Sequence, residues 1–100
     1  MSEQPIRTFG RWSALKLRFL EENHPLMLQA MMEGGTLEEY LMDVEEESSL
    51  VYQRIVDGLR KKWGVPEFVR PGMNQMEWLG QMNAVRMSAS EMTQQVVCSQ

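Results

Sequence analysis

The side chains that could do chemistry in this chain are few and widely spaced. His24 is the single histidine and Cys98 the single cysteine, so neither has a second residue of its kind with which to bind a metal. Glu45, Glu46 and Glu47 are consecutive, so on a helix they point in different directions and cannot act as a carboxylate pair. We therefore expect a protein that is not an enzyme and that has no catalytic residues, no metal site and no cofactor.

Acidic residues are concentrated in the first half of the chain. Residues 19–53 contain nine Asp or Glu residues and no Lys or Arg, whereas the whole chain has a net charge of −4. Such a block is either a solvated helix face or a surface that attracts a basic partner. For the second alternative, the candidate partner-binding residues are Glu38, Glu39, Asp43, Glu45, Glu46 and Glu47.

Basic residues form two groups that each include aromatic neighbours. One group precedes the acidic block, close to Phe9 and Trp12, and the other is adjacent to Trp63. Basic side chains beside aromatic ones can contact phosphates and stack on bases, which makes direct nucleic-acid binding the alternative hypothesis. Its candidate contacts are Arg7, Arg11, Lys16, Arg18, Arg60, Lys61 and Lys62.

Apolar periodicity and stop signals predict an all-α protein, a small helical bundle. Two long helices should form an antiparallel hairpin, with two shorter N-terminal helices packed across it. The expected helices cover residues 11–23, 25–33, 37–62 and 74–97. We divide the chain into an N-terminal arm (residues 1–10), a single helical domain (11–97) and a short tail (98–100). Within the domain, a linker covers about residues 64–73.

Helix ends and buried faces can be predicted in more detail. Asn74 and Thr36 are expected to cap the two long helices, with Glu39 completing a capping box at Thr36. On the first helix, one apolar side is formed by Trp12, Leu15 and Phe19. The buried seam of the last helix is expected at Trp78, Met82, Val85, Ala89, Met92 and Val96. The helix after Pro25 is apolar on most sides, which is typical of a core helix or of an interface.

Length favours one domain, and the cysteine count and the N-terminal residues favour a cytoplasmic protein. One hundred residues is close to the commonest domain size. A lone cysteine cannot form an internal disulfide, and the N-terminal residues lack the apolar segment of a signal peptide. The longest apolar runs are far shorter than the ~20 residues that span a bilayer, so no membrane contact is expected.

Four segments in a fixed order resemble the TnpV family, small proteins encoded on bacterial transposons and conjugative elements. They are R-F-L-E-E-N-H from Arg18, G-G-T-L-E-E-Y-L from Gly34, G-V-P-E from Gly64 and N-Q-M-E-W-L-G-Q-M-N-A-V-R from Asn74. The resemblance covers residues 18–97 and implies a helical accessory protein of a mobile element. It implies no catalytic residue and no defined activity.

These observations lead to a non-enzymatic protein that binds and regulates another protein. We expect its target to be a nucleic-acid-handling machine with a basic channel, and an inhibitor of a CRISPR nuclease would belong to this class. Asn83 and Arg86, one helical turn apart, either pair with acids of the long helix or contact the partner. A self-associating module that forms a homodimer is a further alternative.

Overall fold

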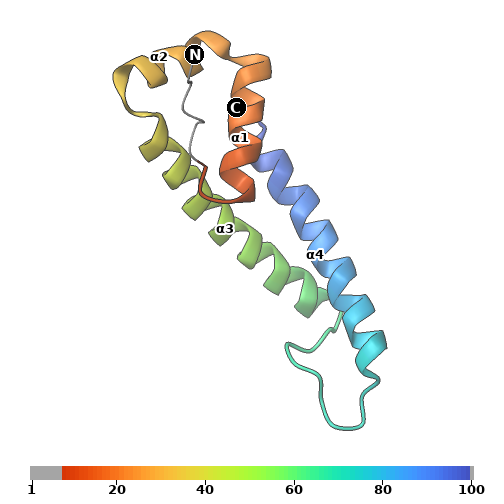
Figure 1. Ribbon diagram of the computed structural model, residues 1–100. Coiled ribbons are helices and arrows are strands. Elements are labelled where there is room, and N and C mark those ends of the chain that lie inside the picture. The colour runs from red at the N-terminus through yellow and green to blue at the C-terminus, as the bar shows by residue number, and fades with distance from the viewer. Residues whose placement is uncertain (1–7, 100) are drawn as a thin grey trace.

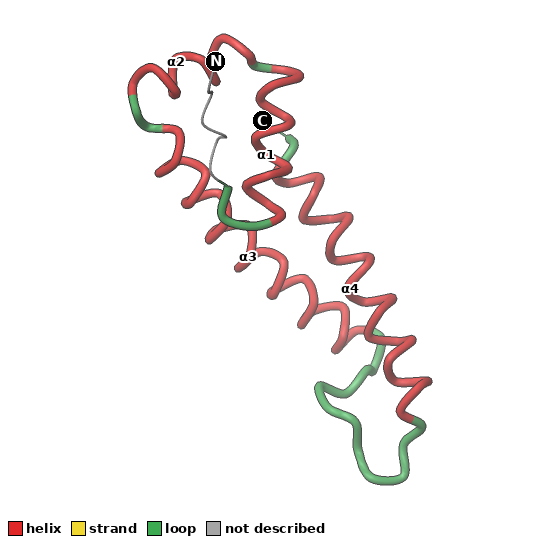
Figure 2. Tube along the Cα trace, viewed as in Figure 1, coloured by secondary structure: helices red, strands yellow, loops and turns green. Residues whose placement is uncertain are grey.

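The computed structural model describes residues 8–99, which form four helices and contain no strand. In chain order they are α1 (Arg11–Asn23), α2 (Pro25–Gly34), α3 (Leu37–Lys62) and α4 (Gln75–Val97). Figures 1 and 2 show α3 and α4 as a long hairpin closed by one loop, with α1 and α2 at the opposite end. The all-α prediction is confirmed, and the helix boundaries differ from the expected ones by one residue at most.

One half of the core lies between the two long helices. Side chains of α3 and α4 pack with a residue from the connecting loop, and this cluster consists of Val56, Val65, Met82, Val85 and Ala89. Trp78 packs against the cluster, and its indole N–H donates a hydrogen bond of 2.8 Å to the Pro66 carbonyl. The start of the loop is thus held against the hairpin.

The other half of the core joins α1 and α2 to the beginning of α3. It consists of Leu20, Leu28, Leu37 and Leu41. The residue before a proline avoids helical backbone angles, so the helical conformation is interrupted at His24. Pro25 then begins α2 as a separate helix. Gly35, with φ of 72°, ends α2 in the left-handed conformation that favours glycine.

The two predicted caps have different outcomes. The Asn74 side chain accepts hydrogen bonds from the backbone N–H groups of Met76 and Glu77, as expected. The capping box at Thr36 is wrong, because the Thr36 side chain accepts no hydrogen bond from α3. Thr36 has φ of −104° and ψ of −3°, away from the extended conformation of a capping residue, and its N–H closes α2 by donating to the Met31 carbonyl.

The buried faces of α1 and α4 are rotated from the expected positions. On α4 the seam continues through Thr93 and Val97, while Met92 and Val96 are 45% and 52% exposed. This rotation turns the second half of α4 toward α1, which packs on both α3 and α4. The α1 residues that become buried are Trp12, Ser13, Lys16 and Leu20. The sequence pattern missed this face because two of its members are polar.

The molecule is elongated, with principal dimensions of 59 × 27 × 19 Å and a radius of gyration of 17.6 Å. A compact domain of this length has a radius of gyration of about 13 Å. A rod has more surface than a sphere, so much apolar surface stays exposed. That surface and the exposed charges therefore define the candidate sites.

Candidate functional site

The short helix α2 presents apolar side chains to solvent at one end of the rod. Within this helix, Leu28 is the one buried residue. Leu26 is 80% exposed, Met27 47% and Met32 51%. The sequence left open whether this helix belongs to the core or to an interface. Its exposure favours an interface, because three large apolar side chains remain in solvent on a helix of ten residues.

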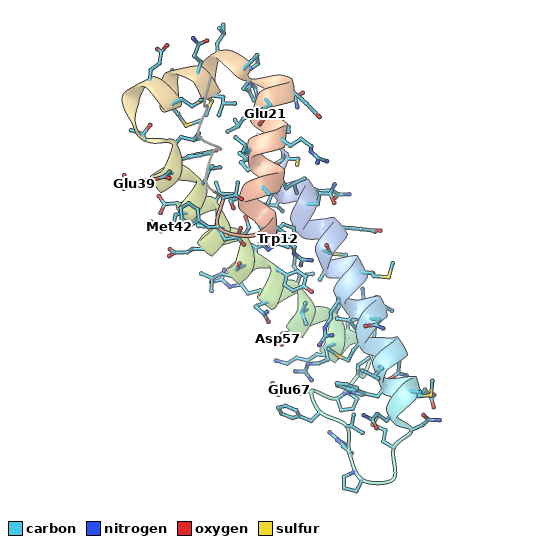
Figure 3. All side chains as sticks on the ribbon, viewed as in Figure 1. Trp12, Glu21, Glu39, Met42, Asp57 and Glu67 are labelled. Atoms are coloured by element: carbon cyan, nitrogen blue, oxygen red, sulfur yellow. The ribbon has the colours of Figure 1, made fainter. Side chains whose placement is uncertain are left out.

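The acidic residues of α3 lie beside this apolar helix, since α3 begins three residues after α2 ends. Figure 3 shows Glu39 and Met42 on the side of α3 that faces away from α4. Five of the six predicted acids are exposed, namely Glu38, Glu39, Asp43, Glu46 and Glu47. We call these five residues the acidic face. The exposed side chains of α2 and the acidic face are thus consecutive along the chain.

Glu45, the sixth predicted partner contact, has an internal role instead. Its carboxylate Oε1 accepts a hydrogen bond of 2.9 Å from the Ser13 backbone N–H, in the first turn of α1. Gly10, which precedes α1, has no side chain that could cap the helix. Glu45 therefore caps α1 from α3. The missing cap residue before Arg11 was the one sequence signal that pointed to an outside acceptor.

Lys16 is also internal, so the predicted contact with nucleic acid does not fit this residue. Its side chain is 4% exposed, and Nζ donates a hydrogen bond of 3.0 Å to the Val97 carbonyl near the end of α4. Burial lowers the pKa of the Lys16 ammonium group, and the nearby Cys98 partly offsets this effect. Lys16 joins α1 to α4, and a buried lysine of this kind could not be recognised from spacing.

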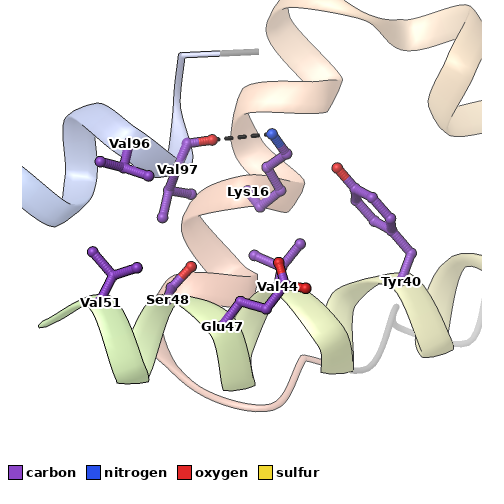
Figure 4. Close-up of a pocket in the computed structure, with 8 residues that line it drawn as sticks. All are labelled: Lys16, Tyr40, Val44, Glu47, Ser48, Val51, Val96 and Val97. Atoms are coloured by element: carbon purple, nitrogen blue, oxygen red, sulfur yellow. Dashed lines mark hydrogen bonds between the residues drawn. The ribbon is translucent and has the colours of Figure 1, made fainter. Parts of the chain in front are cut away.

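A hollow of about 180 Å³ lies next to Lys16, between α1, α3 and α4. Figure 4 shows Tyr40 and Glu47 of α3 lining it together with Lys16, whose bond to Val97 is drawn. Burial, followed by the Glu47 carboxylate, raises the pKa of the Tyr40 hydroxyl. A phenol, a carboxylate and a lysine thus border one hollow, although the lysine is already engaged by the backbone of α4.

The remaining bases of the N-terminal group do not form a single patch. The Arg11 guanidinium lies 4.2 Å from the ring centre of Trp12 and 4.6 Å from that of Tyr52, which is a cation–π arrangement. Arg18 is exposed, and Arg7 lies outside the described residues. Among the described residues of this group, Arg18 is the one exposed base to which the structure assigns no role in packing.

The second basic group lies where α3 meets the loop. Lys61 and Lys62 are exposed. Arg60 has an intramolecular role, because its Nη1 donates to the Val65 carbonyl at 3.3 Å and its Nε lies 4.0 Å from Asp57 Oδ1. The two lysines are therefore the accessible members of this group.

Asn83 and Arg86 are both exposed on α4. Among the described residues, neither forms a hydrogen bond or an ion pair with α3 within bonding distance. Arg86 borders a hollow that Asp57 of α3 and Glu67 of the loop also line. The structure thus leaves both side chains accessible to a partner.

Two further properties concern the described residues 8–99. This part of the chain contains no group of three or more His, Cys, Asp and Glu side chains arranged to hold a metal ion. None of its helices combines the length and the apolarity that crossing a bilayer requires.

Comparison with known proteins identifies a family whose model covers nearly the whole chain. The family described as "Transposon-encoded protein TnpV" matches residues 1–97 of the chain. The resemblance noted above covered residues 18–97, so the family match adds residues 1–17. No curated protein and no solved structure matches the chain.

Proposed function

Because the chain belongs to the TnpV family of transposon-encoded proteins and is thus an accessory protein of a mobile genetic element, we propose that it acts by binding another protein. The binding surface is the apolar helix α2 together with the acidic face of α3. The protein itself carries out no reaction, and it works in the bacterial cytoplasm.

The observation that carries this proposal is the exposure of α2. Leu26 alone leaves four-fifths of its side chain in solvent, and Met27 and Met32 each leave about half. Methionine-rich helix surfaces adapt to the shape of a partner, and burial of such side chains is the main favourable term in association. The acidic face next to it adds selectivity for a basic partner and raises the association rate at low salt.

A basic partner with an apolar pocket matches this surface. Channels and grooves that hold nucleic acid carry dense positive charge, so an acidic helix can compete with the phosphate backbone for them. We therefore propose regulation or inhibition of a nucleic-acid-handling enzyme, and an anti-defence inhibitor of a CRISPR nuclease is one example. Asn83 and Arg86 lie on α4, outside the surface proposed here.

The test is affinity capture from a nuclease-treated lysate of a bacterium that carries the element, with identification by mass spectrometry. We expect wild-type protein to retain a specific nucleic-acid-processing protein. The double variant Leu26→Ser, Met27→Ser should lose it. The control Met76→Ser, Met87→Ser changes two side chains on α4 that are 82% and 66% exposed, and it should retain the same protein. Equal retention by both double variants would remove α2 from the interface.

A further inference from the structure

The loop end of the hairpin carries a basic and aromatic surface, far from α2 and the acidic face. Figure 1 places this loop at the opposite end of the rod from α2. From Arg60 to Met73 the chain contains four Lys or Arg residues and one acid, whereas residues 19–53 contain no Lys or Arg. The two ends of the molecule thus differ in the sign of their charge.

Three basic side chains lie around one hollow between the end of α3 and the loop. Arg60 and Lys61 at the end of α3 line a hollow of about 390 Å³ together with Arg70 of the loop. None of the residues that line this hollow is acidic. The hollow therefore offers a positive environment for an anionic group.

Two aromatic side chains stay exposed at this end. Phe68 is 74% exposed and Trp63 is 46% exposed. Neither is needed for the core between α3 and α4, which at this end is closed by Val65 and Trp78. Large exposed rings without a packing role are available for stacking on a ligand.

The loop displays these side chains from a fixed base. Val65 is 4% exposed, its N–H donates to the Arg60 carbonyl at 2.8 Å, and the Pro66 carbonyl accepts from Trp78. At the other side of the loop, the Met73 N–H donates to the Arg70 carbonyl at 3.0 Å. The bonds of Val65 and Pro66 hold the start of the segment 67–70 to the hairpin, a turn follows the segment, and its residues are exposed.

We propose that this end of the hairpin, formed by Lys61, Lys62, Trp63, Phe68 and Arg70, binds single-stranded nucleic acid. The basic side chains contact phosphates. The two aromatic rings stack on unpaired nucleobases, whose faces are inaccessible in a duplex. An anionic membrane fits less well, because the apolar tip is small and Glu67 precedes Phe68 directly. This site is independent of the surface proposed for the protein partner.

Fluorescence anisotropy with a labelled 20-nucleotide oligo-dT tests the site. We expect binding at 25 mM NaCl, weaker binding to a 20-base-pair duplex, and a loss of affinity with salt. Three phosphate contacts correspond to a slope of log K against log salt of about −2. No anisotropy change at a large excess of protein would overturn the proposal.

Variants separate stacking from charge. Phe68→Ala keeps the charge and should weaken oligo-dT binding at least about fivefold, the lower end for a base stacked on an aromatic ring. Its control is Met87→Ala, which truncates an exposed apolar residue of α4 outside both proposed surfaces. Arg70→Ala should reduce the slope of log K against log salt by the contribution of about one phosphate contact. Arg54→Ala, which removes an exposed base of α3 away from the loop, should leave this slope unchanged. Equal affinities for Phe68→Ala and Met87→Ala would refute stacking at this site.

Vesicles containing phosphatidylserine test the other source of phosphate groups. The proposal requires that the protein remain unbound in a vesicle sedimentation assay at a salt concentration at which oligo-dT binds. Sedimentation with vesicles and no binding of oligo-dT would assign the tip to a membrane surface instead.

Discussion

The carboxylate of Glu45 on α3 caps the first turn of α1 by accepting a 2.9 Å hydrogen bond from the Ser13 N–H. Ser13 is fully buried, and its hydroxyl accepts from the N–H groups of Phe9 and Gly10. This contact ties the beginning of α1 to the middle of the long helix. It also separates Glu45 from its neighbours Glu46 and Glu47, which stay exposed.

Removal of this cap should destabilise the fold. Glu45→Ala leaves the Ser13 N–H without its acceptor, and loss of an N-cap costs about 0.5–2 kcal/mol of unfolding free energy. Urea denaturation followed by circular dichroism measures the difference. Glu46→Ala removes an exposed carboxylate one position later and should stay within about 0.5 kcal/mol of wild type. Similar losses in the two variants would contradict the internal role of Glu45.

A side chain at Gly10 should disturb the same contact. A Cβ atom there would lie 2.7 Å from Cδ and Oε2 of Glu45, so the flexible carboxylate would have to move away from Ser13. We expect Gly10→Ala to lower the unfolding free energy in wild type and to have a smaller effect in the Glu45→Ala background. A double-mutant cycle measures this coupling, expected at about 0.5–1 kcal/mol. Additive effects would show that Gly10 and Glu45 act separately.

The fold could be predicted from the sequence because its main signals are local. Pro25, the stop signals between helices and the apolar periodicity each act within one or two turns of helix, so helix number, order and boundaries followed from them. Asn74 likewise acts on the N–H groups two and three positions along the chain. Such features need no knowledge of tertiary packing.

The candidate site could be predicted only in part, because exposure depends on contacts between distant segments. Lys16 and Glu45 were assigned to surfaces by their charge, yet each bonds to backbone groups far away in the sequence, Val97 and Ser13. Conversely, the apolar side chains of α2 would fill the core of a rounder molecule. They stay exposed here because the hairpin is long and α2 covers only its end.

The buried lysine should make stability depend on pH in a defined direction. Burial lowers the pKa of folded Lys16 below 10.5, so between that lowered pKa and 10.5 the unfolded chain binds more protons than the folded one. The contribution of Lys16 to the unfolding free energy therefore rises with pH in this window. Tyr40, whose pKa is raised above 10.0 in the fold, acts in the opposite direction from pH 10.0 upward.

A comparison in the Tyr40→Phe background isolates the lysine. We expect the stability of Tyr40→Phe to increase relative to the double variant Lys16→Met, Tyr40→Phe as the pH is raised from 7 toward 10.5. Urea denaturation at a series of pH values gives the difference directly. A difference that is constant or that falls with pH would contradict a lowered pKa at Lys16.

The hydrogen bond from Trp78 to the Pro66 carbonyl should hold the loop in place. Trp78→Phe keeps an aromatic ring but removes the donor, which should cost about 1 kcal/mol. We also expect faster amide hydrogen exchange in the loop, at residues 64–73, with little change in α1. Leu79→Ala, at the next position and 42% exposed, serves as the control and should leave exchange in the loop unaltered. Unchanged exchange in Trp78→Phe would mean that Val65 alone anchors the loop.

The most direct test of partner binding reverses charge on the acidic face without touching Glu45. Glu39→Lys, Glu46→Lys changes two exposed residues of α3, and Glu77→Lys, Glu91→Lys makes the same change in net charge at exposed positions on α4. Both are compared with wild type in the nuclease-treated capture, after thermal unfolding has shown that they are folded. We predict that the α4 variant retains the partner protein and that the α3 variant loses it. Retention of the same protein by both variants would contradict binding through the acidic face.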